Sequence, residues 1–216
     1  MVKIKPVIKW SGSKRKQSEE IIKYLPKEIN TYYEPFIGGG SVMIQLLHSD
    51  IKFKEVICSD INSELIDLWN TIKNEPNKLI ESYSNMWSEM NSTTDISIKK
   101  SYYFDVRKKF NETKSPYLFL FLSRTCMNGL IRYNSKGEFN TSLHLTRNGI
   151  EPKTLQNIIN LWSDKLNTHN VSFICQSYES IVSKSGDFIY LDPPYSSTKG
   201  MYNGTLDYNI LWEWME

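Results

Sequence analysis

The sequence predicts an α/β protein built around a parallel β-sheet. A strand-like run at 31–36 is followed by three glycines, an amphipathic helix at 41–48 and a second strand-like run at 54–59. A strand, a tight turn, a helix and a strand in this order form a βαβ unit, and the two strands of such a unit run parallel. Short apolar runs bounded by turn residues at 171–175 and 187–191 predict two further strands.

The segments between these strands show mostly helical spacing of their apolar residues. A loop after Trp10 leads into a helix that ends before Pro26, because proline cannot continue a helix. The stretches 63–109, 116–130 and 152–166 are predicted to be helical, the last of them amphipathic. Turn residues and short β-like pieces after Met127 predict a β-hairpin.

Composition excludes several classes of protein. Hydrophobic residues make up 40% of the 216 residues and charged residues 23%, which is enough apolar material for a folded core. Three cysteines without a CxxC pair disfavour a disulfide scaffold or a zinc ribbon, and the three histidines have no metal-ligand spacing. Without a long apolar run or a signal peptide, we expect a soluble cytoplasmic protein. The absence of alanine, with abundant Ile, Asn, Lys and Tyr, suggests an AT-rich bacterial or phage gene.

Positive charge is concentrated in the middle of the chain. The formal net charge is only +2, yet ten lysines and arginines against three acidic residues lie between Lys99 and Arg147. Tyrosines and phenylalanines are interleaved with these basic residues. Such a pattern is typical of a surface that binds nucleic acid, although a solvated helix face would also produce it.

The glycine turn predicts a nucleotide-like ligand. It reads Glu34-Pro35-Phe36-Ile37-Gly38-Gly39-Gly40 and directly follows the first strand, where glycines let the backbone approach a ligand closely. A dinucleotide fingerprint would need another glycine where Met43 stands, so that reading is weak. The acid-x-Phe-x-Gly-x-Gly pattern is instead typical of folds that bind S-adenosylmethionine. Asp60, at the end of the next strand, is placed to accept hydrogen bonds from ribose hydroxyls.

The segment Asp192-Pro193-Pro194-Tyr195 follows the last predicted strand. Two consecutive prolines form a rigid extended turn that has no N–H groups to donate. Asp192 and the Pro193 carbonyl can then accept hydrogen bonds from an exocyclic amine, while Tyr195 stacks on the ring of the base. The segment therefore predicts a site for an amine-bearing base.

Six ordered motifs give the sequence a resemblance to a known family. They are Lys9-Trp10-Ser11-Gly12-Ser13-Lys14, 34–40, Ser59-Asp60-Ile61-Asn62, 128–134 with 137–140, Ser177-Tyr178, and 192–195. In this order they are similar to motifs of Dam-type (D12 class) DNA adenine-N6 methyltransferases. The resemblance implies a Rossmann-like class I methyltransferase sheet with an inserted, mostly helical target-recognition domain. It implies a catalytic core at 1–62 and 150–216 and a DNA-binding domain at 63–149.

The resemblance also implies roles for individual residues. The expected catalytic residues are Asp192, Pro193, Pro194 and Tyr195. The cofactor, S-adenosyl-L-methionine, is expected to contact Trp10, Lys14, Glu34, Pro35, Phe36, Gly38, Gly40, Asp60, Ile61, Ser177, Tyr178 and Asp192. Double-stranded DNA is expected to contact Lys9, Asn128, Leu130, Arg132 and Asn134. Arg132 is the expected reader of a guanine, and Lys14 is expected near the methionine carboxylate of the cofactor. No metal site is expected.

The function implied is transfer of a methyl group to N6 of a flipped adenine in duplex DNA, as in restriction–modification systems. Two alternatives stay open: an RNA or protein amine as substrate, and a silent or partner-dependent DNA-binding subunit. Enzymes that recognise GATC tend to carry an aromatic residue where Met127 stands and a proline in the 140–143 segment, so another adenine-containing target is also open.

The end of the sequence adds one further expectation. Only 21 residues follow Tyr195, and a parallel crossover takes about a dozen residues or more. The resemblance implies a sheet of about seven strands, of which the 192–195 segment ends the fourth, so we expect a sheet that lacks its C-terminal strands. Either the sequence is part of a longer enzyme, or a second polypeptide completes the sheet.

Overall fold

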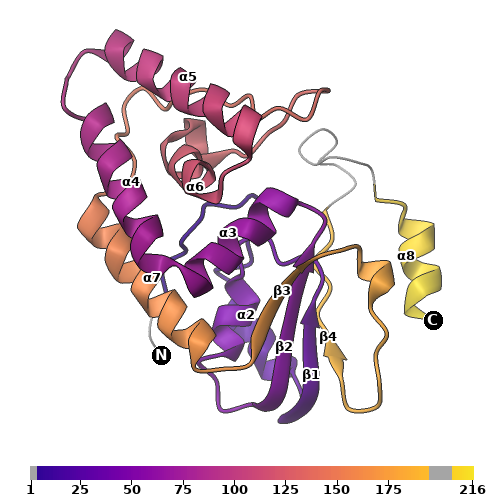
Figure 1. Cartoon of the computed structure of the whole chain (residues 1–216). Helices are drawn as coiled ribbons and strands as arrows, with labels where there is room; N and C mark the ends of the chain where they lie inside the picture. Colours follow the sequence, from indigo (N-terminus) through magenta and orange to yellow (C-terminus); the bar gives the residue numbers. More distant parts are fainter. Residues whose placement is uncertain (1–3, 195–205) are drawn as a thin grey trace.

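The computed structural model describes residues 4–194 and 206–216. Its centre is a four-stranded sheet in the order β3-β2-β1-β4, in which each neighbouring pair is parallel (Figure 1). The strands are β1 (Glu28–Glu34), β2 (Lys52–Asp60), β3 (Val171–Cys175) and β4 (Phe188–Ile189). The predicted α/β class with a parallel sheet is confirmed.

Strand β1 begins three residues earlier and ends two residues earlier than predicted. Its start is polar, but Glu28 pairs with Lys52 of β2 and therefore belongs to the ladder. It ends at Glu34 because Pro35 has no N–H to donate to a neighbouring strand. In the middle of the sheet, Tyr32 pairs with Val56 on one side and with Phe188 on the other.

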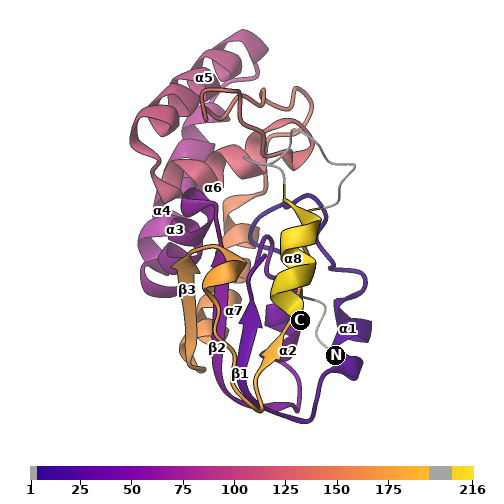
Figure 2. The same ribbon diagram turned by 90° about the vertical axis from the view of Figure 1, so that its right-hand side faces the viewer.

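Three helices cover one face of the sheet: α2 (Ser41–Leu46), α3 (Ser63–Asn74) and α7 (Pro152–Asn167). Their contact centres on Trp69, whose ring centroid lies 5.0 Å from that of Trp162 and 5.6 Å from that of Phe173. Helix α8 (Tyr208–Met215) lies on the opposite side of the sheet (Figure 2). The short α1 (Ser18–Ile21) and the 3-10 turn η1 (Ile22–Tyr24) end before Pro26, as predicted.

The stretch 63–109, predicted to be helical, is divided among three helices. After α3, α4 (Pro76–Met90) begins with a proline at its first turn, where the missing N–H costs nothing. Asp95 caps α5 (Ile96–Thr113) by accepting a hydrogen bond from the Ser97 N–H at 2.7 Å. Together with α6 (Pro116–Thr125), these helices form a layer beyond the carboxyl ends of the strands (Figure 1).

Helix α6 ends at Thr125, earlier than predicted. Cys126 is extended, and the 3-10 turn η2 (Met127–Gly129) holds Asn128 in the left-handed region at φ 56°. The predicted hairpin follows, with one isolated bridge between Tyr133 and Phe139 in place of longer strands. We refer to residues 132–140 as the hairpin. Among the described helices, none is both long enough and apolar enough to cross a bilayer.

Candidate active site

A cavity of about 720 Å³ opens at the carboxyl ends of β1, β2 and β4. Ligands of open parallel sheets bind in this crevice, because loops from neighbouring strands diverge there. Most of the residues predicted to bind the cofactor or the target base line it. They are Trp10, Lys14, Glu34, Phe36, Gly38, Asp60, Ile61, Ser177, Tyr178, Asp192, Pro193 and Pro194.

Two predicted cofactor residues stand apart from this cavity lining. Pro35 is not among the lining residues, and neither is Gly40. Gly40 precedes α2 at φ +62°, and a Cβ there would lie 3.1 Å from Trp69 and 3.2 Å from Trp162. Glycine at position 40 therefore allows the backbone to pack closely against these two tryptophan rings. Tyr195 lies outside the described residues.

The turn between β1 and α2 requires glycine at position 38. Its φ is +45°, and a Cβ there would lie 2.7 Å from Cδ1 of Trp10. The Gly38 carbonyl accepts a hydrogen bond of 3.1 Å from the Trp69 indole N–H, which fixes the turn from below. The N-terminal segment thus packs directly on the glycine turn, and the two together form one wall of the cavity.

Asp60 presents a carboxylate at the end of β2. Its Oδ1 accepts a 3.0 Å hydrogen bond from the Asn62 N–H, and its Oδ2 lies 3.5 Å from the Gly38 N–H. Burial raises the pKa of Asp60 to about 6, and the surrounding backbone N–H groups limit the rise. At neutral pH the group is mostly ionised and retains free acceptor positions.

Glu34 is a buried acid with a different charge state. Glu34 is only 3% exposed, and the Tyr32 hydroxyl donates a hydrogen bond of 2.8 Å to its Oε2. Burial raises the pKa of Glu34 to about 8, opposed by the bonds from Tyr32 and the Met43 N–H, with Asp192 adding to the rise. Glu34 is therefore mostly protonated at neutral pH.

Asp192 and Lys14 form an ion pair across the cavity. The two residues come from opposite ends of the chain, and their side chains are 21% and 17% exposed respectively. Nearby, the Tyr208 hydroxyl donates to the Pro194 carbonyl, which ties the start of α8 to the segment after β4. Lys14 thus contacts the residue predicted to hold the target amine.

Aromatic and apolar side chains line the cavity beside Asp60. The ring centroids of Phe36 and Tyr178 are 5.6 Å apart, and Trp214 of α8 packs edge-on against Tyr178 at 5.3 Å. Ser177 accepts a hydrogen bond from the Glu179 N–H at the start of η3 (Tyr178–Ser180). Ile61 is 63% exposed, an unusual position for an isoleucine that leaves it available to a ligand.

The residues predicted to contact DNA lie outside the cavity, but the structure brings two distant sets of them together. A Cβ at Gly129 would lie 2.5 Å from Cδ of Lys9, so Lys9 packs on the backbone between Asn128 and Leu130. Burial and the charges of Arg124 and Arg147 lower the pKa of Lys9. Of these three positive residues, Arg124 is buried, whereas Lys9 and Arg147 are exposed.

The two predicted DNA-contacting residues of the hairpin have different surroundings. Arg132 is exposed, and its Nε donates to Asn140 Oδ1 at 2.9 Å, which leaves the other guanidinium N–H groups available. The Asn134 side chain is engaged in the turn itself. Its amide donates to Glu138 Oε2 at 2.8 Å, and its Oδ1 accepts from the N–H groups of Lys136 and Glu138.

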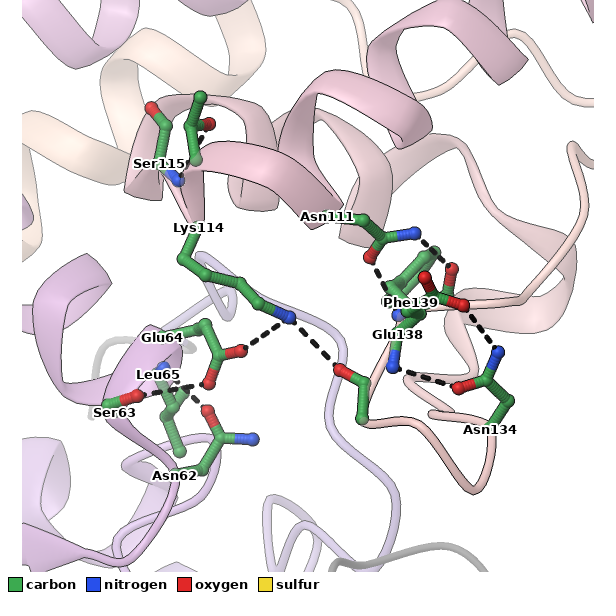
Figure 3. A network of polar contacts seen from close by, with 12 residues as sticks. Asn62, Ser63, Glu64, Leu65, Asn111, Lys114, Ser115, Asn134, Glu138 and Phe139 are labelled. Carbon is green, nitrogen blue, oxygen red and sulfur yellow. Dashed lines mark hydrogen bonds and ion pairs between the residues drawn. The ribbon is translucent and has the colours of Figure 1, made fainter.

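Sequence reasoning missed several residues of the cavity. Glu64, Lys114, Ile131, Tyr133 and Gly137 also line it, from the start of α3, the α5–α6 junction, the residue before the hairpin and the hairpin itself. Figure 3 shows Lys114 between Glu64 and the hairpin. Tyr133 and Gly137 belong to recognised motifs, but the motifs pointed to DNA and not to the cofactor side. For Lys114 the sequence carries no local signal.

The acidic side chains that the structure describes in the cavity are not grouped as metal ligands. Within residues 4–194 and 206–216, no group of three or more His, Cys, Asp or Glu side chains is placed to hold a metal ion. A nucleoside ligand fits the glycine turn, the strand-terminal acid and the aromatic wall.

Comparison with known proteins decides the family. A family model described as D12 class N6 adenine-specific DNA methyltransferase matches residues 10–216. The chain belongs to this family of D12 methyltransferases. The predicted family and the predicted enzyme class, adenine-specific DNA methyltransferase, are confirmed.

Curated relatives of this D12 methyltransferase come from archaea and bacteria. The type II methyltransferase M.MjaIII of Methanocaldococcus jannaschii is 38% identical over 211 residues, covering 90% of this chain and 70% of the relative. The DNA adenine methylase of Escherichia coli strain K12 is 31% identical over 211 residues, covering 95% of this chain and 70% of the relative. The type II methyltransferase M1.LlaDCHI of Lactococcus lactis is 32% identical over 205 residues, covering 90% of this chain and 66% of the relative. The chain thus spans about two thirds of the length of such relatives.

Proposed function

We propose that this D12 methyltransferase transfers the methyl group of S-adenosylmethionine to N6 of an adenine that is flipped out of duplex DNA. The observation that carries the proposal is the placement of Asp60 and the glycine turn in the same cavity as Asp192. A cofactor and a reacting base need adjoining sites, because direct transfer requires the two reacting atoms in line at short distance.

The residues of the cavity fit the proposed cofactor. Asp60, Phe36, Tyr178 and Ile61 line the cavity; in this proposal Asp60 accepts from ribose hydroxyls and the other three offer apolar surface to the adenine ring. The methionine end is assigned to Trp10, Glu34 and Lys14. When bound, S-adenosylmethionine supplies a methyl group that its sulfonium already activates. The protein therefore needs no nucleophile of its own for this reaction.

Asp192 is proposed to orient the amine of the target base. The N6 amine of adenine is conjugated with the ring and is a poor nucleophile. Hydrogen bonds from it to Asp192 and the Pro193 carbonyl favour a pyramidal nitrogen with an available lone pair. A carboxylate has about four acceptor sites, so the contact of Oδ1 with Lys14 leaves Oδ2 for the amine. In this proposal Lys14 holds the carboxylate in place and Tyr195 stacks on the base.

Residues 63–149 are proposed as the target-recognition domain, and 1–62 with 150–216 as the catalytic core. The basic stretch from Lys99 to Arg147 would contact phosphates, while Arg132 would read a base edge. The packing of Lys9 beside Asn128 and Leu130 supports one continuous DNA surface from both parts.

The sheet itself suggests a further partner. Strand β4 has two residues and lies at one end of the described strand order. An unpaired edge is a template for another strand. We propose that further strands pair with β4, from a longer form of the chain or from a second polypeptide.

Replacing Asp192 by Ala tests the proposed function. We expect loss of methyl transfer from tritiated S-adenosylmethionine to adenine-containing duplex DNA, with a much smaller loss of cofactor affinity by calorimetry. Asp164→Asn on the exposed face of α7 is the matched control and should transfer normally. Equal loss of cofactor affinity and transfer in Asp192→Ala would assign Asp192 a different role. Faster transfer to RNA than to duplex DNA by the wild-type protein would contradict the proposed substrate.

A further inference from the structure

A single lysine joins three segments at the rim of the cavity. Lys114 Nζ lies 3.3 Å from Oε1 of Glu64 and donates to the Gly137 carbonyl at 3.0 Å (Figure 3). Glu64 belongs to the first turn of α3, Lys114 follows α5, and Gly137 is in the hairpin. All three residues also line the cavity.

The surroundings of this ion pair distinguish it from an ordinary surface pair. The Glu64 side chain is only 13% exposed, that of Lys114 is 39% exposed, and Lys114 Nζ lies 5.4 Å and 5.7 Å from the ring centroids of Phe110 and Tyr133. Salt and water screen a pair with one buried partner less than a fully exposed pair. The Lys114 backbone is left-handed at φ 54°, a conformation that glycine or asparagine adopts at helix ends at lower cost. Lys114 therefore makes these side-chain contacts while its backbone adopts a conformation that costs energy for a lysine.

A short chain of bonds connects Glu64 to the residue proposed to hold the cofactor ribose. The Asn62 N–H donates to Asp60 Oδ1 at 3.0 Å, and Asn62 Oδ1 in turn accepts from the Leu65 N–H at 2.8 Å. Asn62 is the N-cap of α3, and Glu64 lies two residues beyond it. Asp60, Asn62 and the start of α3 are therefore joined by hydrogen bonds, and Glu64 lies in the same helical turn.

The other end of the link is the hairpin. Asn111 near the end of α5 clamps Phe139 on both sides, accepting from its N–H at 2.8 Å and donating to its carbonyl at 3.1 Å. Within the turn, the Gly137 N–H donates to the Asn134 carbonyl at 3.0 Å. The hairpin also carries Arg132, so the position of Gly137 bears on where that guanidinium is presented.

We propose that Lys114 is a positioning residue that couples occupancy of the cofactor cavity to DNA binding by the hairpin. This inference rests on the proposed function, in which the hairpin contacts duplex DNA. A cofactor held by Asp60 orders α3 and Glu64, Glu64 orders Lys114, and Lys114 orders Gly137. The duplex then binds a hairpin that is already ordered, and the effect is reciprocal, because coupling between two binding sites is the same in both directions.

The test measures the affinity of one duplex with and without saturating S-adenosylhomocysteine, which occupies the cofactor site without methyl transfer. The duplex carries an adenine that the wild-type protein is first shown to modify. The variants are Lys114→Gln, Glu64→Gln, the double variant and Lys114→Arg. Lys109→Gln, at an exposed lysine of α5 five positions before Lys114, is the charge-matched control.

For the wild-type protein we expect S-adenosylhomocysteine to tighten duplex binding at least about fivefold. Lys114→Gln and Glu64→Gln should each bring the ratio of duplex affinities with and without S-adenosylhomocysteine close to one. The double variant should lose no more of this coupling than either single variant. Lys114→Arg should restore the ratio, whereas Lys109→Gln should weaken duplex binding and keep the ratio. Thermal unfolding and S-adenosylhomocysteine affinity of each variant show whether it is folded.

An unchanged ratio in folded Lys114→Gln would overturn the inference, and so would losses that multiply in the double variant. A wild-type protein without coupling would overturn it as well. Failure of the proposed function looks different, because the wild-type protein would then transfer no methyl group to the duplex at all.

Discussion

Replacing Glu34 by Gln should flatten the dependence of stability on pH. Burial raises the pKa of Glu34 from 4.5 to about 8, so between these values the folded protein holds a proton that the unfolded chain releases. Folding stability from this group is therefore complete below pH 4.5 and is lost as pH rises towards 8. Gln has the same shape and stays neutral, and its amide oxygen can accept from the Tyr32 hydroxyl.

The size of the effect follows from the shift. One pKa unit corresponds to about 1.4 kcal/mol, so linkage gives a destabilisation by Glu34 of about 1 kcal/mol at pH 5 and about 3 kcal/mol at pH 7. The difference in unfolding free energy between variant and wild type should therefore change by about 2–3 kcal/mol over this range, in favour of the variant at pH 7. Asp60 also has a raised pKa, but it is present in both proteins and cancels in the difference.

Urea unfolding at pH 5, 6, 7 and 8, followed by the fluorescence of the six tryptophans, measures this difference. Asp164→Asn is the control and should run parallel to the wild type. Parallel curves for Glu34→Gln and wild type would refute the reasoning, because they would mean that Glu34 is ionised in the folded protein at neutral pH.

Three further predictions concern the turn, the ribose site and the hairpin. Gly38→Ala should destabilise the fold by about 1–3 kcal/mol and weaken cofactor binding, because its Cβ would collide with Trp10 at φ +45°; unchanged thermal unfolding and unchanged calorimetric affinity would contradict this. Asp60→Ala should weaken S-adenosylmethionine by about 1–3 kcal/mol at pH 7, and wild-type affinity should fall as pH drops through about 6, where Asp60 becomes protonated; an affinity that does not change between pH 5 and 7 would argue against a ribose contact. Arg132→Ala should loosen sequence choice by about 1–3 kcal/mol, seen when the modified adenines of treated DNA are sequenced; an equal loss of affinity for all duplexes would make Arg132 a phosphate contact.

Features encoded over a few neighbouring residues could be predicted from the sequence. The βαβ unit follows from apolar periodicity and the glycine turn, because φ near +45° and the close approach of Trp10 leave no room for a side chain at Gly38. Element boundaries that a distant partner decides are not encoded locally. Strand β1 extends to Glu28 only because Lys52 of β2 lies beside it, and the long helical stretch divides where Pro76 and Asp95 can each begin a new helix.

The candidate site divides in the same way. The sequence by itself determined which residue types face the cavity at the strand ends, since side chains that follow neighbouring parallel strands meet at one edge of the sheet. Only the tertiary structure decided their partners and charge. Lys14 and Asp192 are 178 positions apart in the chain, and Lys114 meets Glu64 through the packing of three separate segments. The protonation of Glu34 depends on how completely the fold removes it from water. Burial and long-range pairing are properties of the whole fold, and no local pattern encodes them.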